Sequence, residues 1–266
     1  AAAGGEPGPG GGGERDPQRR CELAWNASGD RLLGVGNSTG VSLWTFGEGR
    51  GACQASSVPT GGALAKVYCG AFVSPASVIA TAGRRADPDG GGPGFGGPVV
   101  RAWPRVGAGL CVWDTLAAPG AALVAHDGAV DSAPSAMPAE YSCLAWEEGR
   151  QRLISGTRTG EIRIFDLRQR RVSQRFDAHG GVPLRYCFVL PACGRLVTLS
   201  ATSELKAWDL RDLECVETIP RLHQAPRSGV GSMMLGKADA VTCAAMLSER
   251  HLLTGGQDGT VLLTRL

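Results

Sequence analysis

The part of the chain that comes closest to a chemical motif lies between residues 231 and 237. Its glycines and its lysine have the spacing of a phosphate-binding loop, in which backbone N–H groups hold phosphate oxygens. The next position of such a loop carries a hydroxyl that binds Mg²⁺, whereas this chain has Ala238 there. No apolar strand precedes the segment either, because Pro226 and polar residues lead into it. We therefore expect a connecting loop and no bound nucleotide.

Other groups that could support acid–base or metal chemistry are scattered along the chain. The four histidines do not pair at the spacing of metal ligands, and no Cys-x-x-Cys pair occurs. No serine, cysteine or carboxylate is accompanied by a recognisable base in a catalytic motif. The sequence therefore predicts a protein that is not an enzyme and that holds neither a metal ion nor a cofactor.

Basic and aromatic side chains are the candidates for contacts with partner proteins. One short turn carries a basic run, which in most proteins is simply solvated, and the pattern Asp-x-Arg occurs twice, at Asp166 and at Asp209. A tryptophan lies inside a Gly/Pro-rich insertion, where it could anchor a partner or fold back onto the neighbouring repeat. The candidate partner-binding residues are Trp103, Arg168, Arg170, Arg171 and Arg211.

Composition narrows the class of protein further. The net charge of +2 gives no global field that would indicate nucleic acid, and no apolar run approaches the roughly 18 residues of a membrane helix. The nine cysteines, an odd number, favour free thiols in the reducing cytoplasm. The N-terminus has neither a signal peptide nor a Met, so we expect a longer parent chain or a truncated gene model.

The elements that must position these residues are five copies of one sequence repeat. Each copy has an apolar run, a turn, a second run that ends in small residues, another turn, and a third run. A sheet this small cannot bury both faces alone, and radial stacking of such sheets solves the problem. The sequence predicts an all-β propeller with five visible blades, at residues 21–46, 65–125, 141–177, 182–219 and 240–266.

The domain organisation follows from these repeats. Residues 1–20 are rich in Gly and Pro and are expected to be disordered, and residues 21–266 form the propeller domain. A Gly/Pro/Arg-rich insertion at 84–108 should form a loop on one face. The last repeat lacks a fourth strand that residues 1–20 cannot supply, so we expect an incomplete ring that belongs to a larger propeller with further blades upstream.

The aromatic-Asp ends of the repeats resemble WD40 repeats. In that family a His, a Ser or Thr, a turn Asp and a Trp form a buried hydrogen-bonded tetrad, so the resemblance implies structural roles here. The turn position holds Thr39, Thr159 and Thr202, which indicates degraded tetrads and blades that depend mainly on apolar packing. The residues to which the resemblance gives WD40-like structural roles are His126, His179, Trp44, Trp113, Asp114, Phe165, Asp166, Trp208, Asp209 and Asp258.

A closer resemblance covers most of residues 21–266. The segments 71–83, 110–116, 153–156 and 164–170 with 176–179, in that order, resemble the C-terminal propeller of the DmX-like (rabconnectin) family, and 229–231 with 252–260 fits its end. That family is similar to the large subunit of the RAVE complex. The resemblance implies a scaffold that promotes assembly of the vacuolar proton-pumping ATPase, with V-ATPase or RAVE-type subunits as partners at endomembranes.

Two alternatives of other classes stay open at this point. The Asp-x-Arg pairs also resemble the short motif by which some WD40 proteins dock on the adaptor of a cullin-ring ubiquitin ligase, which would make the chain a substrate receptor. An enzyme is the third possibility, because propellers can host active sites in the central channel, but it should show ionisable groups that converge there.

Overall fold

The computed structural model describes residues 22–26, 28–36, 40–47, 53–59, 64–73, 78–85, 108–114, 122–127, 141–169, 171–223 and 241–266. These residues form nineteen strands in five antiparallel sheets, and none of them lies in a helix long and apolar enough to cross a membrane. Each sheet is one blade, and the strands within a blade are neighbours in chain order. The predicted all-β, WD40-type propeller with five visible blades is confirmed.

The blades are numbered in chain order. Blade 1 contains β1 (Glu22–Trp25), β2 (Arg31–Val35), β3 (Gly40–Phe46) and β4 (Cys53–Pro59). Blade 2 contains β5 (Leu64–Phe72), β6 (Val78–Arg85), β7 (Ala108–Asp114) and β8 (Ala122–Asp127). Blade 3 contains β9 (Tyr141–Glu147), β10 (Arg152–Thr157), β11 (Glu161–Asp166) and β12 (Arg171–Asp177). Blade 4 contains β13 (Leu184–Leu190), β14 (Arg195–Ser200), β15 (Leu205–Asp209) and β16 (Cys215–Ile219). Blade 5 contains β17 (Val241–Ser248), β18 (His251–Gly256) and β19 (Val261–Arg265).

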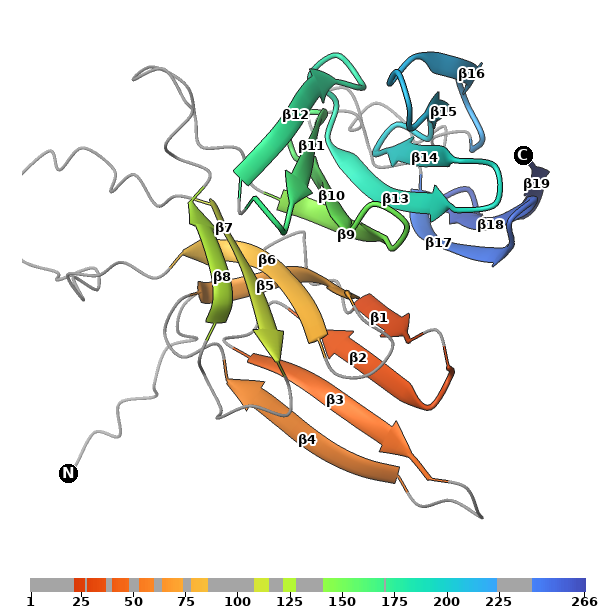
Figure 1. Cartoon of the computed structure of the whole chain (residues 1–266). Helices are drawn as coiled ribbons and strands as arrows, with labels where there is room; N and C mark the ends of the chain where they lie inside the picture. Colours follow the sequence, from red (N-terminus) through yellow and green to blue (C-terminus); the bar gives the residue numbers. More distant parts are fainter. Residues whose placement is uncertain are drawn as a thin grey trace, which may run out of the picture.

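The core consists of apolar clusters that lie between consecutive blades. Leu33 of blade 1 packs with Val67 and Ile79 of blade 2, and Cys69 of blade 2 packs with Leu153 of blade 3. The clusters continue between blades 3 and 4 and between blades 4 and 5. Figure 1 shows the resulting arc, with blades 1 and 5 at its two ends. Radial stacking of the sheets therefore buries the apolar faces, as the repeats predict.

Tight turns between the second and third strands hold the connections between blades. Gly160, at a φ of +81°, directly precedes β11, and its carbonyl accepts hydrogen bonds from the N–H groups of Ala178 and His179. Ser203 has the same place in blade 4, with a φ of +61°, and its carbonyl accepts from the N–H of Leu222. Each turn thus fixes the segment that leads into the next blade.

The structure adds one strand that the sequence did not predict. β4, at Cys53–Pro59, completes blade 1, and its polar residues and terminal proline hid it from the apolar pattern. The strands β6 and β7 reach to Arg85 and start at Ala108, so both extend slightly into the predicted insertion. The rest of that insertion, the N-terminal residues 1–20 and the segment 231–237 lie outside the described residues.

Candidate functional site

The turns that follow the third strands of blades 3 and 4 form one rim of the molecule. The carboxylate of Asp166 accepts hydrogen bonds from the backbone N–H groups of Arg168 and Gln169, at 2.8 and 3.1 Å. The carboxylate of Asp209 accepts one from the N–H of Arg211, at 2.7 Å. Because both aspartates are used within their own turns, they fix the turn and leave the arginine side chains as the exposed groups.

A neighbouring turn of blade 3 joins these two turns into one surface. The Nη1 of Arg150 and the Nη2 of Arg152 donate to the carbonyl oxygen of Leu210, at 2.9 and 3.3 Å. The Nε of Arg168 donates to Gln151 Oε1, at 3.0 Å, so the turns of blades 3 and 4 are linked at this rim. Arg168 and Arg211 therefore lie on the same end of neighbouring blades, as their equivalent repeat positions predict.

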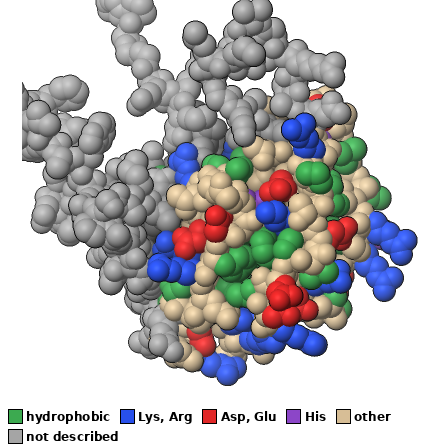
Figure 2. Space-filling view, turned by 90° about the horizontal axis from the view of Figure 1, so that it is seen from above, with side chains coloured by type: hydrophobic (Ala, Val, Ile, Leu, Met, Phe, Trp, Pro, Cys, Tyr) green, Lys and Arg blue, Asp and Glu red, His purple; other side chains and the backbone are tan. Residues whose placement is uncertain are grey.

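Figure 2 shows the molecule from above, on the side where β12 and β16 lie in Figure 1. Acidic and basic side chains are mixed across this face, and hydrophobic side chains are exposed between them. A surface with both charge signs and scattered apolar groups suits contacts with proteins better than contacts with a polyanion.

The central channel is the other candidate site. The first strands of all five blades line a cavity of about 890 Å³. The charged groups on its wall are Glu22, Glu148 and Arg185, which come from three different blades. Within the described ranges, no three His, Cys, Asp or Glu side chains gather in a way that could hold a metal ion.

A buried thiol, that of Cys187, lies on the described part of the channel wall. Contact with the Cys143 thiol, together with burial, raises the pKa of Cys187 well above its ordinary value. The nucleophilic form of cysteine is the thiolate, which this environment disfavours. Cys187 therefore acts as a small apolar residue in the packing between blades 3 and 4.

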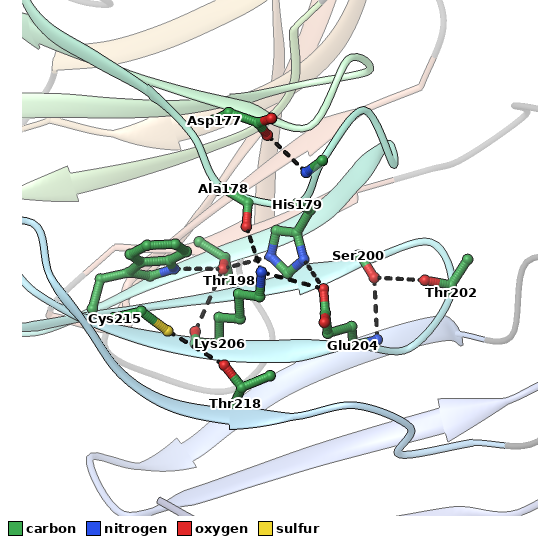
Figure 3. Close-up of polar contacts among 12 residues, drawn as sticks. Asp177, Ala178, His179, Thr198, Ser200, Thr202, Glu204, Lys206, Cys215 and Thr218 are labelled. Carbon is green, nitrogen blue, oxygen red and sulfur yellow. Dashed lines mark hydrogen bonds and ion pairs between the residues drawn. The ribbon is translucent and has the colours of Figure 1, made fainter.

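A buried polar network ties the connection before blade 4 to that blade (Figure 3). His179 Nε2 lies 2.8 Å from Thr198 Oγ1, which also accepts the indole N–H of Trp208 at 2.9 Å. His179 Nδ1 lies 2.8 Å from Glu204 Oε2. Burial is the main cause that lowers the pKa of His179, so the imidazole is neutral at pH 7, with its proton on Nδ1 toward the carboxylate.

This network corrects the expectation that the tetrad of blade 4 is degraded. Thr202 occupies the usual aspartate position and contacts Ser200. The carboxylate comes instead from Glu204, two residues later, whose longer side chain reaches the imidazole that the shorter turn residue does not. His179, Thr198 and Trp208 are thus joined to Glu204, an acid at a position where the family pattern has none.

Blade 5 contains a second network, and its histidine was not predicted as a structural residue. His223 Nε2 lies 2.8 Å from Thr254 Oγ1, and its Nδ1 lies 3.2 Å from Asp258 Oδ1 and 3.1 Å from Thr260 Oγ1. Ser203 holds the backbone of His223, because its hydroxyl donates to the His223 carbonyl at 2.8 Å. The sequence signal for this network was Asp258, which keeps the aspartate of the family pattern. The sequence of the connection before blade 5 did not show that His223 is the residue that contacts Asp258.

The remaining predicted residues have varied locations. Phe165 is buried between blades 2 and 3, and Trp44 lies over Gly34 on blade 1. Trp113, Asp114, His126 and Arg171 lie in strands whose backbone alone is described, and Trp103 and Arg170 lie outside the described residues. Among the predicted residues, the structure joins His179 and Trp208 through Thr198, and it places Arg168 and Arg211 on one rim without a contact between them in the described hydrogen bonds.

Comparison with known proteins bears on these observations. No family model matches the chain. Over 194 residues it is 31% identical to DmX-like protein 1 of Mus musculus, and 30% identical to DmX-like protein 1 of Homo sapiens. The predicted resemblance to the DmX-like family is confirmed. The match covers 71% of this chain, which spans about 5% of the length of these DmX-like relatives.

Proposed function

We propose that this DmX-like propeller is a non-catalytic scaffold that takes part in assembly or regulation of the vacuolar proton-pumping ATPase. The observation that carries the proposal is the similarity to DmX-like protein 1 over 194 residues. The link to the proton pump, to RAVE-type subunits and to endomembranes comes from the likeness to the family. We extend it to this chain as a proposal, together with a cytoplasmic location.

The architecture supports a role in binding. Four interblade clusters fix the sheets relative to one another, so the loops and edges that they carry form a rigid surface. The charged groups on the channel wall, Glu22, Glu148 and Arg185, belong to different blades. The buried histidines have both ring nitrogens within hydrogen-bond distance of neighbouring side chains. A base in such a position has no free nitrogen for a substrate proton.

The test is a binding experiment with the tagged chain as bait. Purified proton-pump subunits and RAVE-type subunits are offered in one arm, and the adaptor of the cullin-ring ligase in the other. Retention of pump or RAVE-type subunits supports the proposal. If the chain retains neither at micromolar concentration while its sheets are intact by circular dichroism, the proposed function is wrong.

The receptor of a ubiquitin ligase is the second candidate, because Arg168 and Arg211 lie exposed on one rim after aspartate-capped turns. The double variant Arg168→Glu/Arg211→Glu should abolish adaptor binding and leave pump or RAVE-type binding intact. The matched control is Arg221→Glu, which reverses an exposed arginine in the connection after β16. If the wild-type chain does not bind the adaptor, this alternative is wrong. Adaptor binding that survives the double variant would exclude Arg168 and Arg211 as the docking site.

A further inference from the structure

The outer strand of blade 3 carries an exposed hydroxyl group at an irregularity of the sheet. β12 is the outermost strand of that blade (Figure 1). Ile164 of β11 pairs with Gln174 of β12, and the next residue of β11, Phe165, pairs with Val172. Ser173 is the extra residue between these two pairs and forms a β-bulge. Its side chain is exposed, and its Oγ donates a hydrogen bond to the Ile164 carbonyl oxygen at 3.0 Å.

The same bulge recurs in the outer strands of the two neighbouring blades. The extra residue is Leu123 of β8 in blade 2 and Val216 of β16 in blade 4. Val216 is 50% exposed, so the side chain of the extra residue reaches solvent in blade 4 as it does in blade 3. Of these three blades, blade 3 is the one with a hydroxyl group at the bulge.

The residues that precede this serine are basic. Arg170 and Arg171 stand three and two positions before Ser173. Protein kinases choose substrates partly by charge, and an acidic substrate cleft pairs its carboxylates with guanidinium groups at such positions. In the whole sequence, only Ser155, Ser173 and Thr198 are hydroxyl residues with an arginine three positions before them, and Ser173 alone has a second arginine two positions before it.

The structure separates these three hydroxyl groups by their exposure. Ser155 of β10 and Thr198 of β14 are 3% and 0% exposed. The Ser155 hydroxyl donates to the carbonyl oxygen of Arg163 at 3.2 Å, and Thr198 belongs to the network of His179. A kinase could reach either of them only after the blade unfolds, whereas Ser173 is exposed in the folded chain.

We propose that Ser173 is a phosphorylation site for a serine/threonine kinase with an acidic substrate cleft. In the reaction, the Ser173 oxygen forms a bond to the γ-phosphorus of ATP, and the bond from that phosphorus to the bridging oxygen of ADP breaks. The hydroxyl proton passes to the aspartate base of the kinase. The cleft has to separate only the start of β12 from β11, where Arg171 pairs with Asp166 and Val172 pairs with Phe165.

The modified chain should keep its fold and change the charge of the outer edge. A phosphoryl group adds a charge of about −1.5 to −2 at pH 7, two residues from the exposed Arg175. The esterified oxygen can no longer donate to the Ile164 carbonyl. The contact of β12 with blade 4 is made by Phe176, whose ring lies 4.9 Å from the Trp208 ring, and it does not involve Ser173.

The experiment is a phosphorylation assay on the purified full chain with Mg²⁺, ATP and the catalytic subunit of cyclic-AMP-dependent protein kinase, and mass spectrometry locates the phosphate. We expect about one phosphate per chain, on Ser173. Ser173→Ala should lower incorporation to less than about a tenth of the wild-type level. The double variant Arg170→Ala/Arg171→Ala, which keeps the serine, should lower kcat/KM by about tenfold or more, because charge-assisted hydrogen bonds to the cleft are lost.

The matched control is Ser248→Ala, which removes an exposed serine without arginines at those positions and should be phosphorylated like the wild type. Circular dichroism checks that each variant is folded. A wild-type chain that takes up no phosphate overturns the proposal, and so does an undiminished rate in the double arginine variant. Phosphate on Ser155 or Thr198 also overturns it, because the substrate would then be the unfolded chain.

Discussion

The hydroxyl of Thr198 offers the sharpest test of what stabilises blade 4. Thr198 is 0% exposed, and its Oγ1 meets the Trp208 indole N–H at 2.9 Å and His179 Nε2 at 2.8 Å. Replacing Thr198 with Val keeps the shape of the side chain and removes the oxygen. Replacing it with Ser keeps the oxygen and removes one methyl group.

The two substitutions should have clearly different costs. In Thr198→Val, the indole N–H and the imidazole nitrogen both lose their partner while they stay buried, at about 1–3 kcal/mol each, so the free energy of unfolding should fall by about 2–6 kcal/mol. In Thr198→Ser, the loss of one buried methyl should cost about 1 kcal/mol. The more conservative change in volume is thus expected to be the more damaging one.

The assay is equilibrium unfolding in urea, followed by tryptophan fluorescence and by circular dichroism. The matched control is Thr218→Val, an exposed threonine of β16, which should change the free energy of unfolding by less than about 0.5 kcal/mol. If Thr198→Val is as stable as the wild type, or more stable than Thr198→Ser, apolar packing decides the stability of this blade and the reasoning is wrong.

Three further predictions concern other parts of the molecule. Burial lowers the pKa of His179 below its ordinary value of 6.5, so the unfolded chain binds the proton more readily than the folded one. The free energy of unfolding should therefore decrease as pH falls below about 6.5. Urea titrations at several pH values should show a smaller pH dependence for His179→Gln than for the wild type. Gly156→Ala places a Cβ 2.5 Å from Cys143 Sγ and 3.0 Å from Leu184 of blade 4, and should lower the free energy of unfolding by about 1–3 kcal/mol. Gly255→Ala places a Cβ 2.7 Å from the exposed Cys243 Sγ and no closer than 3.6 Å to any other side chain, and should cost less than about 1 kcal/mol. Ser203→Ala removes the hydroxyl that holds the buried His223 backbone and should speed amide hydrogen exchange in blade 5 more than in blade 3; equal exchange in both blades would contradict it.

Much of the fold could be predicted because blade structure is a local property. Alternating apolar residues and turn signals at a regular spacing predict short antiparallel strands, and their repetition predicts stacked sheets. β4 (Cys53–Pro59) escaped because Gln54, Ser56 and Ser57 interrupt its apolar residues and a proline ends it, and because an outer strand need not bury both faces. The alternation of apolar and polar residues that reveals inner strands is therefore weak in an outer strand.

The candidate sites were harder to predict, because their residues come from different blades. The sequence places Arg168 and Arg211 at equivalent repeat positions, and the rim they share depends on the contacts of Arg150 and Arg152 with Leu210. His223 could not be matched to Asp258 from spacing, because the long connection between blades 4 and 5 does not match the connections between the other repeats.

The sequence by itself determined the number of visible blades, the strands within most of them and the absence of any recognisable catalytic motif, because these depend on residues close together in the chain. Only the tertiary structure decided that Glu204 supplies the carboxylate for His179, since that contact depends on how far a side chain reaches across a packed sheet. It also decided which apolar faces stay open. Burial depends on what lies opposite a residue in space, so Ile162 and Val261 share a repeat position and differ in exposure from 0% to 69%.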